Sequence, residues 1–302
     1  MHTPVLIEEV IQLLAITPDD RVLDATLGWG GHAMRLIQEG PAQFAGIDQD
    51  PVALAHCRQV LPAECLIVEG NFRSFATLIP FQPTKILADL GMSSMQLDDE
   101  NRGFSFMQNA PLDMRMSQSG RSASDWLQTA TPTDLSNAFY RYGDLIHNRQ
   151  LVNAIIQQRK KGGVTHTNHL VELVKTAYRF GSRGMMMKTL SQVFQAVRMA
   201  INDELDALQQ WMQAVHHQLP IGGRVAIITF HSIEDRLVKH GFHAHPDFKA
   251  LTKHVIQASQ AEITANPRSK PAKLRVYERQ PNQDTASKSQ EKDQGVQRPY
   301  KG

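Results

Sequence analysis

Residues 22–32 read VLDATLGWGGH, and this stretch determines the fold that we expect. A short apolar run predicts a buried strand, three glycines within four positions predict a tight turn, and the residues from Ala33 onward predict a helix. Glycine permits both the backbone conformation of such a turn and the close approach of backbone N–H groups to a ligand. The helix that follows would aim its N-terminal amides at that ligand. The stretch therefore predicts a site for a nucleotide-like cofactor.

The class of cofactor depends on two carboxylates near this turn. A second expected strand ends in Asp48, where the hydroxyls of a ribose need an acceptor. Gly28, Gly30 and Ala33 match the loose dinucleotide pattern, which is weak evidence by itself. Asp24 favours S-adenosylmethionine, because its carboxylate suits the amino group of a methionine moiety and would repel a pyrophosphate. A dinucleotide and a purely structural glycine turn are the alternatives.

The composition restricts the partners and the compartment. The chain has 302 residues and a formal net charge of +2, so any nucleic-acid footprint must be local. Cys57 and Cys65 lack CxxC spacing, which indicates a reducing compartment and no thiolate metal site. The histidines at 240, 243 and 245 lack partners in ligand spacing, so we expect no metal. We find no signal-peptide pattern and no apolar run approaching about 20 residues, and therefore expect a cytoplasmic protein without membrane association.

Alternating strand and helix patterns predict an α/β protein with a doubly wound, Rossmann-like sheet. Further strands are expected at residues 65–68, 85–90, 222–230 and 273–277, the last as an edge strand. Residues from about 122 to 213 have a helical pattern, which predicts an insertion. We therefore expect a discontinuous cofactor-binding core, an inserted helical substrate-recognition domain and a disordered tail, at residues 1–110 with 214–280, 111–213 and 281–302, respectively.

The segment from Gly91 to Met116 has neither helical nor strand periodicity. Structureless stretches of that length are usually functional or disordered, and the aromatic residues and methionines of this one argue against disorder. Phe104 and Phe106 could stack on a base, with packing in the protein core an equal alternative. Phe72, which follows the third expected strand, could flank an adenine or belong to the core.

Two carboxylates, Asp89 and Asp113, are the candidates for catalysis. The fourth expected strand delivers Asp89 to the carboxyl edge of the sheet, where such folds bind ligands. A carboxylate there could accept a proton from a poorly nucleophilic amine and stabilise the developing positive charge. The structural alternatives are a turn cap for Asp89 and an ion pair with Arg115 for Asp113.

Six ordered motifs resemble those of the bacterial 16S rRNA (cytosine-N4)-methyltransferases, and the resemblance covers nearly the whole chain. They are residues 2–6 (HTPVL), 24–32 (DATLGWGGH), 89–99 (DLGMSSMQLDD), 102–106 (RGFSF), 111–116 (PLDMRM) and 230–236 (FHSIEDR). The resemblance implies a methyltransferase core that uses S-adenosylmethionine to methylate N4 of a cytidine in the decoding region of small-subunit (16S) rRNA. It also implies cofactor contacts at Gly30, Gly31, His32, Asp48, Phe72, Asp89 and Gln96.

The insertion departs from the family pattern at residues 143–145 (GDL) and 189–192 (TLSQ). Two alternatives therefore stay open: a catalytically idle RNA-binding or ribosome-assembly factor, and a methyltransferase acting on another nucleic-acid amine. The expected partner is small-subunit ribosomal RNA or the ribosomal subunit, and a homodimer is one option for the oligomeric state. Two basic runs could hold phosphates, with a solvated face as the alternative. They are Arg159-Lys160-Lys161 and the set Arg268, Lys270, Lys273, Arg275 and Arg279.

Overall fold

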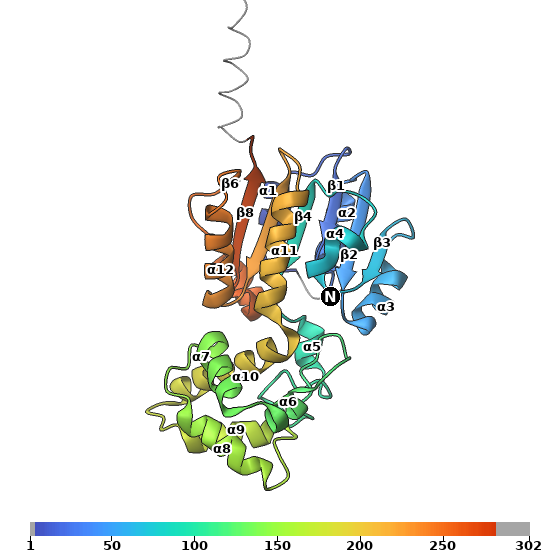
Figure 1. The fold of residues 1–302 in the computed structure, drawn as a ribbon. Coiled ribbons are helices and arrows are strands. Elements are labelled where there is room, and N and C mark those ends of the chain that lie inside the picture. Colours follow the sequence, from blue (N-terminus) through green and yellow to red (C-terminus); the bar gives the residue numbers. More distant parts are fainter. Residues whose placement is uncertain (1–3, 282–302) are drawn as a thin grey trace, which may run out of the picture. The chain divides into compact units, whose positions relative to one another are not determined.

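The structure is a computed structural model that describes residues 4–281. Within this range the chain forms two compact units. Figure 1 shows the chain with colours that follow the sequence. The sheet unit comprises residues 4–47, 60–90 and 209–281, and the helical unit comprises residues 48–59 and 91–208. The motif residues His2 and Thr3 lie outside the described residues, and so does the predicted tail beyond Pro281. The role of a substrate-recognition domain stays a prediction.

The sheet unit contains one eight-stranded sheet with the order β3-β2-β1-β4-β5-β8-β6, and β7 pairs with β8 (Figure 1). β1 is parallel to β2 and to β4, and β4 is parallel to β5. The strands are β1 Arg21–Asp24, β2 Gln43–Asp48, β3 Leu66–Glu69, β4 Lys85–Asp89, β5 Arg224–Thr229, β6 Phe248–Ala250, β7 Ile256–Gln257 and β8 Lys273–Arg279. The predicted doubly wound α/β sheet is confirmed.

The strand order reverses on either side of β1, which lies between β2 and β4. Open α/β sheets bind their ligands at such a point, beyond the carboxyl ends of the strands. Asp24 and Asp89 are the last residues of β1 and β4. Asp48 is the last residue of β2 and the first residue of the helical unit. The predicted position of Asp89 at the carboxyl end of its strand is confirmed.

The prediction that the last strand forms an edge of the sheet is wrong. β8 lies between β5 and β6 and is antiparallel to both, and β7 also pairs with it. β6 and β7 have three and two residues, and strands this short carry no readable periodicity. Val276 and Tyr277 of β8 point to opposite faces of the sheet, and both are buried, Tyr277 with its ring stacked on Phe242.

Helices cover both faces of the sheet. α1 buries Val10 and Leu14, which lie on one face of an amphipathic helix, and it contacts α2. On the other face α11 meets α12 through His216 and Phe242, whose ring centroids are 4.9 Å apart. α11 lies in front of the sheet in Figure 1 and α1 lies behind it. The helices are α1 Ile7–Leu14, α2 Gly31–Gln38, α4 Phe75–Leu78, α11 Glu204–Gln218, α12 Ser232–His243 and α13 Gln260–Ala265.

The helical unit has its own apolar core, which includes Trp126, Phe139 and Phe194. Its helices begin at clear caps, since Ser122 and Thr131 each form a capping box with an aspartate three residues later. The helices are α3 Pro51–Val60, α5 Ser94–Asp98, α6 Ala123–Thr129, α7 Pro132–Gly143, α8 Arg149–Arg159, α9 Thr167–Ala177 and α10 Arg183–Asn202. Across residues 4–281, no helix combines the length and apolar character needed to cross a membrane.

Candidate active site

The glycine turn after β1 has the geometry that its sequence predicts. Gly30 is the N-cap of α2 and has φ +75°, in the left-handed region that favours glycine. Gly31 is restricted for a different reason, because a Cβ there would lie 2.9 Å from the ring of Pro4. The turn therefore brings the N-terminus of α2 to the carboxyl end of β1, as a site for an anionic or polar ligand requires.

Two side chains of the turn hold the ends of β1 and β4 together. Asp24 is buried, and its Oδ1 accepts a hydrogen bond from the backbone N–H of Thr26 at 3.2 Å. The hydroxyl of Thr26 accepts from the backbone N–H of Asp89 at 2.6 Å. The position of Asp89 is thus set by the turn as well as by the sheet.

His32 lies in the first turn of α2, and its tautomer follows from its partners. Nε2 is 2.9 Å from the carbonyl oxygen of Val5, which can only accept, so Nε2 carries the proton of the neutral ring. Burial lowers the pKa of His32, although the charge of Asp24 opposes this, and the ring is neutral at pH 7. The lone pair of Nδ1 therefore faces Oδ2 of Asp89 across 3.6 Å.

The environment of Asp89 favours its protonated form. Burial, and secondarily the charge of Glu234, raises the pKa of Asp89 to about 7. Oδ1 is buried and has no hydrogen-bond partner among the described residues, while the side chain as a whole is 25% exposed. The lone pair on Nδ1 of His32, 3.6 Å away, disfavours an ionised Asp89 relative to a protonated one. Such a carboxyl exchanges its proton near neutral pH, which suits a general acid or base.

Phe72 opens the short 3₁₀-helix η1 Phe72–Ser74 after β3 and is partly buried. Its ring packs edge-to-face on Trp211, with centroids 5.9 Å apart. Packing in the core and contact with an adenine are therefore compatible for Phe72, because one edge of its ring packs on the protein while part of the side chain stays accessible.

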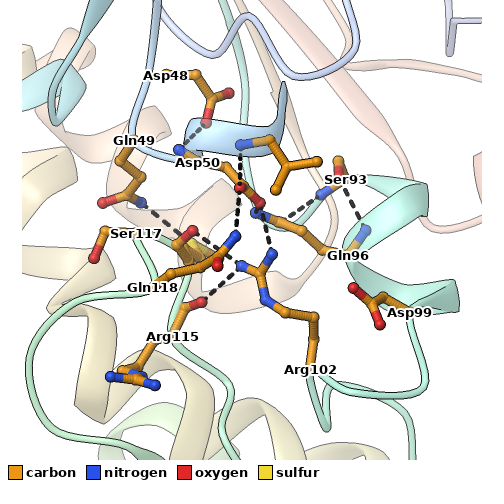
Figure 2. Close-up of polar contacts among 12 residues, drawn as sticks. Asp48, Gln49, Asp50, Ser93, Gln96, Asp99, Arg102, Arg115, Ser117 and Gln118 are labelled. Carbon is orange, nitrogen blue, oxygen red and sulfur yellow. Dashed lines mark hydrogen bonds and ion pairs between the residues drawn. The ribbon is translucent and has the colours of Figure 1, made fainter. Parts of the chain in front are cut away.

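In the helical unit, Asp48 begins a tight turn into α3. Oδ1 of Asp48 accepts a hydrogen bond from the backbone N–H of Asp50 at 2.8 Å, and Asp50 in turn accepts from the backbone N–H of Val52 at 3.1 Å. Figure 2 shows the carboxylate of Asp48 directed at the start of this turn. The side chain that we expect to hold the ribose is therefore oriented by the backbone that follows it.

Gln96 is buried in α5 and has structural partners at both ends of its amide. Oε1 accepts from the backbone N–H of Ser93 at 3.0 Å, which completes a capping box, and Nε2 donates to Asp50 at 2.8 Å (Figure 2). α5 interrupts the segment from Gly91 to Met116, for which the sequence predicts no helix. A cofactor contact of Gln96 stays a prediction.

Asp113 forms the ion pair that was the alternative to a catalytic role. Arg115 donates to it through Nε at 3.1 Å and through its terminal nitrogen at 2.6 Å, and the backbone N–H of Arg115 donates to it at 2.9 Å. Both carboxylate oxygens are therefore engaged, and Asp113 could serve a reacting amine only by releasing Arg115.

Phe104 and Phe106 have partners within the helical unit. Phe104 is buried in the apolar core, and Phe106 packs edge-to-face on Phe194 with centroids 5.4 Å apart. Their geometry favours core packing over stacking on a base.

The members of the two basic runs differ in how far their side chains are exposed. Arg275 and Lys273 both pair with Asp235, at 2.7 and 3.4 Å, whereas Arg268 and Lys270 are exposed. In the other run, Arg159 donates to two backbone carbonyls at the end of α6, while Lys160 and Lys161 are exposed. The exposed members are the candidates for contacts with phosphates.

The two departures from the family pattern lie against each other. Nε2 of Gln192 in α10 donates to the carbonyl oxygen of Gly143 at 2.8 Å, and a Cβ on Gly143 would lie 2.9 Å from the carbonyl oxygen of Gln192. Asp144 caps α7 with φ +52°, a conformation that aspartate tolerates better than most residues. The departures thus form one packing contact between α7 and α10.

Residues 4–281 contain no group of three or more histidine, cysteine or carboxylate side chains that could hold a metal ion.

The sequence reasoning missed the buried pair formed by Asp50 and Arg102. Arg102 stands in one of the six family motifs and Asp50 before a helix-starting proline, but their spacing of 52 residues gives no local signal.

The family model described as MraW methylase family matches residues 1–280. A Ribosomal RNA small subunit methyltransferase H from Deinococcus radiodurans is 43% identical over 282 residues, covering 92% of this chain and 89% of the relative. A relative of the same name from Deinococcus deserti is 44% identical over 283 residues, with 92% and 93% covered. Among solved structures, an rRNA methylase from Streptococcus thermophilus is 11% identical with a TM-score of 0.42, covering 93% of this chain and 99% of that chain.

Proposed function

The chain belongs to the MraW methylase family, and we propose that it transfers the methyl group of S-adenosylmethionine to N4 of a cytidine in the decoding region of 16S rRNA. The observation that carries the proposed chemistry is Asp89, a carboxyl with a pKa of about 7 beside the glycine turn. The names of the relatives support a small-subunit rRNA substrate, and residues 24–32 support the cofactor.

The exocyclic amine of cytosine needs help because its lone pair is delocalised into the ring. The bound cofactor supplies an electrophilic methyl group; N4–CH₃ forms, S–CH₃ breaks and N4 loses a proton. We assign that proton to ionised Asp89, for which general-base catalysis is worth roughly 10²–10⁴-fold. Nδ1 of His32, which Val5 keeps unprotonated, lies 3.6 Å from Oδ2 of Asp89, and its lone pair favours the protonated carboxyl that results.

We propose cofactor contacts at seven residues, each placed here within its own unit. Gly30, Gly31, His32, Phe72 and Asp89 belong to the sheet unit, and Asp48 and Gln96 belong to the helical unit. Asp113 is the second candidate for the proton acceptor, and its bond to Arg115 would have to open first.

Incubation with methyl-labelled cofactor and small subunits that lack the modification tests the function. We expect incorporation into 16S rRNA, located by mass spectrometry at N4 of one cytidine. Cofactor binding without incorporation would instead indicate an idle assembly factor, and a label on another base would indicate a different amine.

We place the reaction in the cytoplasm, and light scattering would decide whether the protein is a homodimer.

Replacing Asp48 by Ala is expected to weaken cofactor binding at least about tenfold, because charge-assisted hydrogen bonds to the ribose are each worth about 1.5–3 kcal/mol. Calorimetry measures the dissociation constant. The Asp48→Asn variant is the matched control, since it keeps an acceptor for the backbone N–H of Asp50 but loses the charge. An intermediate affinity is expected for it, and unchanged affinity in both variants would assign Asp48 to structure alone.

Replacing Arg268 and Lys270 together by Ala is expected to weaken binding to ribosomal substrate and to reduce its salt dependence. The slope should fall by roughly 0.7–0.9 log unit for each phosphate that the variant no longer neutralises. The charge-matched comparison is Lys160→Ala with Lys161→Ala, two exposed lysines of the helical unit. If the lysine variant loses the salt dependence of binding and the variant at Arg268 and Lys270 keeps it, the RNA footprint lies on the helical unit.

A further inference from the structure

The helical unit contains a buried ion pair that links two segments distant in sequence. Arg102 donates to Oδ2 of Asp50 at 3.0 Å, and their side chains are 10% and 4% exposed (Figure 2). Burying an ion pair is costly unless its remaining donors and acceptors are satisfied. Asp50 meets this condition, since it also accepts from Val52, Gln96 and Gln118. Arg102 meets it with its two terminal nitrogens, while its buried Nε has no hydrogen-bond partner among the described residues.

On the Asp50 side, the pair is attached to the turn that begins with Asp48. The backbone N–H of Asp50 donates to Asp48, while its side chain accepts from the first turn of α3. A ligand that engages the carboxylate of Asp48 therefore contacts a group that is hydrogen-bonded to the backbone of Asp50, and the side chain of Asp50 in turn holds Arg102.

On the Arg102 side, the guanidinium holds the segment that carries Asp113. Its second terminal nitrogen donates to the carbonyl oxygens of Arg115 and Met116 at 2.8 and 3.1 Å. The backbone carbonyl of Arg102 accepts from Met114 at 2.8 Å. In Figure 2 the side chain of Arg115 extends away from this cluster, so that only its carbonyl takes part.

We infer that Arg102 is a positioning residue that couples cofactor binding at Asp48 to the placement of residues 113–117, so that bound cofactor strengthens the binding of RNA. This inference rests on the proposed function. A planar guanidinium can serve the carboxylate and both carbonyls at once, which a single ammonium cannot do. By linkage, RNA must strengthen cofactor binding by the same factor.

The Arg102→Lys variant tests this coupling, because it keeps the positive charge beside Asp50 but loses the planar guanidinium that reaches the carboxylate and both carbonyls at once. The dissociation constant of small-subunit RNA is measured with and without S-adenosylhomocysteine, and hydrogen exchange of residues 113–117 is followed with the same ligand. In the unmodified protein we expect at least about fivefold tighter RNA binding and slower exchange when the ligand is bound. In Arg102→Lys both effects should disappear, while each affinity measured alone stays within about threefold.

Arg121→Lys is the matched control, since Arg121 is exposed in the neighbouring sequence and contacts Thr129 at 3.4 Å. Asp50→Asn is the second variant, in case Arg102→Lys does not fold, and it should lose the coupling as well. Coupling that persists in the folded variants, or is absent from the unmodified protein, overturns the inference. Absence of methyl transfer would contradict the proposed function separately, because the exchange measurement needs only S-adenosylhomocysteine.

Discussion

Replacing Asp89 by Asn is expected to reduce methyl transfer by roughly 10²–10⁴-fold, the range for loss of a general base. In the unmodified protein, the ionised fraction of Asp89 grows as pH rises through about 7, so the rate of the chemical step should rise over the same interval. The variant should lack this rise. Single-turnover rates between pH 5.5 and 8.5, at saturating cofactor, measure both effects.

The same substitution is expected to stabilise the fold at high pH. The folded-state pKa of Asp89 lies above its unfolded value of 3.8, so ionisation disfavours the folded state. This penalty is absent below pH 4, grows between pH 4 and 7 and is complete above 7. At pH 8 Asp89→Asn should therefore gain on the order of 2–4 kcal/mol in the free energy of unfolding.

Asp19→Asn is the matched control for both measurements, because it makes the same chemical change on an exposed carboxylate of the sheet unit. We expect little effect on rate or stability. A variant at Asp89 that keeps its activity and pH profile would place the proton acceptor elsewhere, with Asp113 the next residue to test.

The parts of the site that the sequence predicts are those with a local cause. The glycine turn, the strands that end at Asp24 and Asp89, and the helix from Gly31 each follow from periodicity and turn chemistry over fewer than a dozen residues. The cofactor contacts came instead from resemblance to a family, because no periodicity marks a residue such as Gln96.

The features that the sequence could not predict depend on contacts distant along the chain. The protonation of His32 is set by the carbonyl of Val5, 27 residues away, and the pKa of Asp89 by burial and by Glu234. Asp113 shows a limit of a different kind, because its spacing from Arg115 allows either an ion pair or a free carboxylate. Only the fold around Gly120, whose carbonyl also accepts from Arg115, distinguishes the two.

Replacing Gly103 by Ala is expected to destabilise the helical unit severely. Gly103 has φ +68°, and a Cβ there would collide with the carbonyl oxygen of Pro111 and lie 3.0 Å from the backbone nitrogen of Asp113. Since those atoms belong to the backbone, relief requires moving the segment that carries the candidate carboxylate. We expect a loss of at least about 3 kcal/mol in urea unfolding, with a matching loss of methyl transfer.

Gly120→Ala isolates the steric part of this effect. Gly120 has φ +79°, but a Cβ there would meet no atom within 4 Å, so only the left-handed backbone is disfavoured, at about 1–2 kcal/mol. The difference between the two variants then measures the close approach of Gly103 to residues 111–113. If both variants lose the same stability, that approach is not rigid, and residues 113–117 can move without cost to the fold.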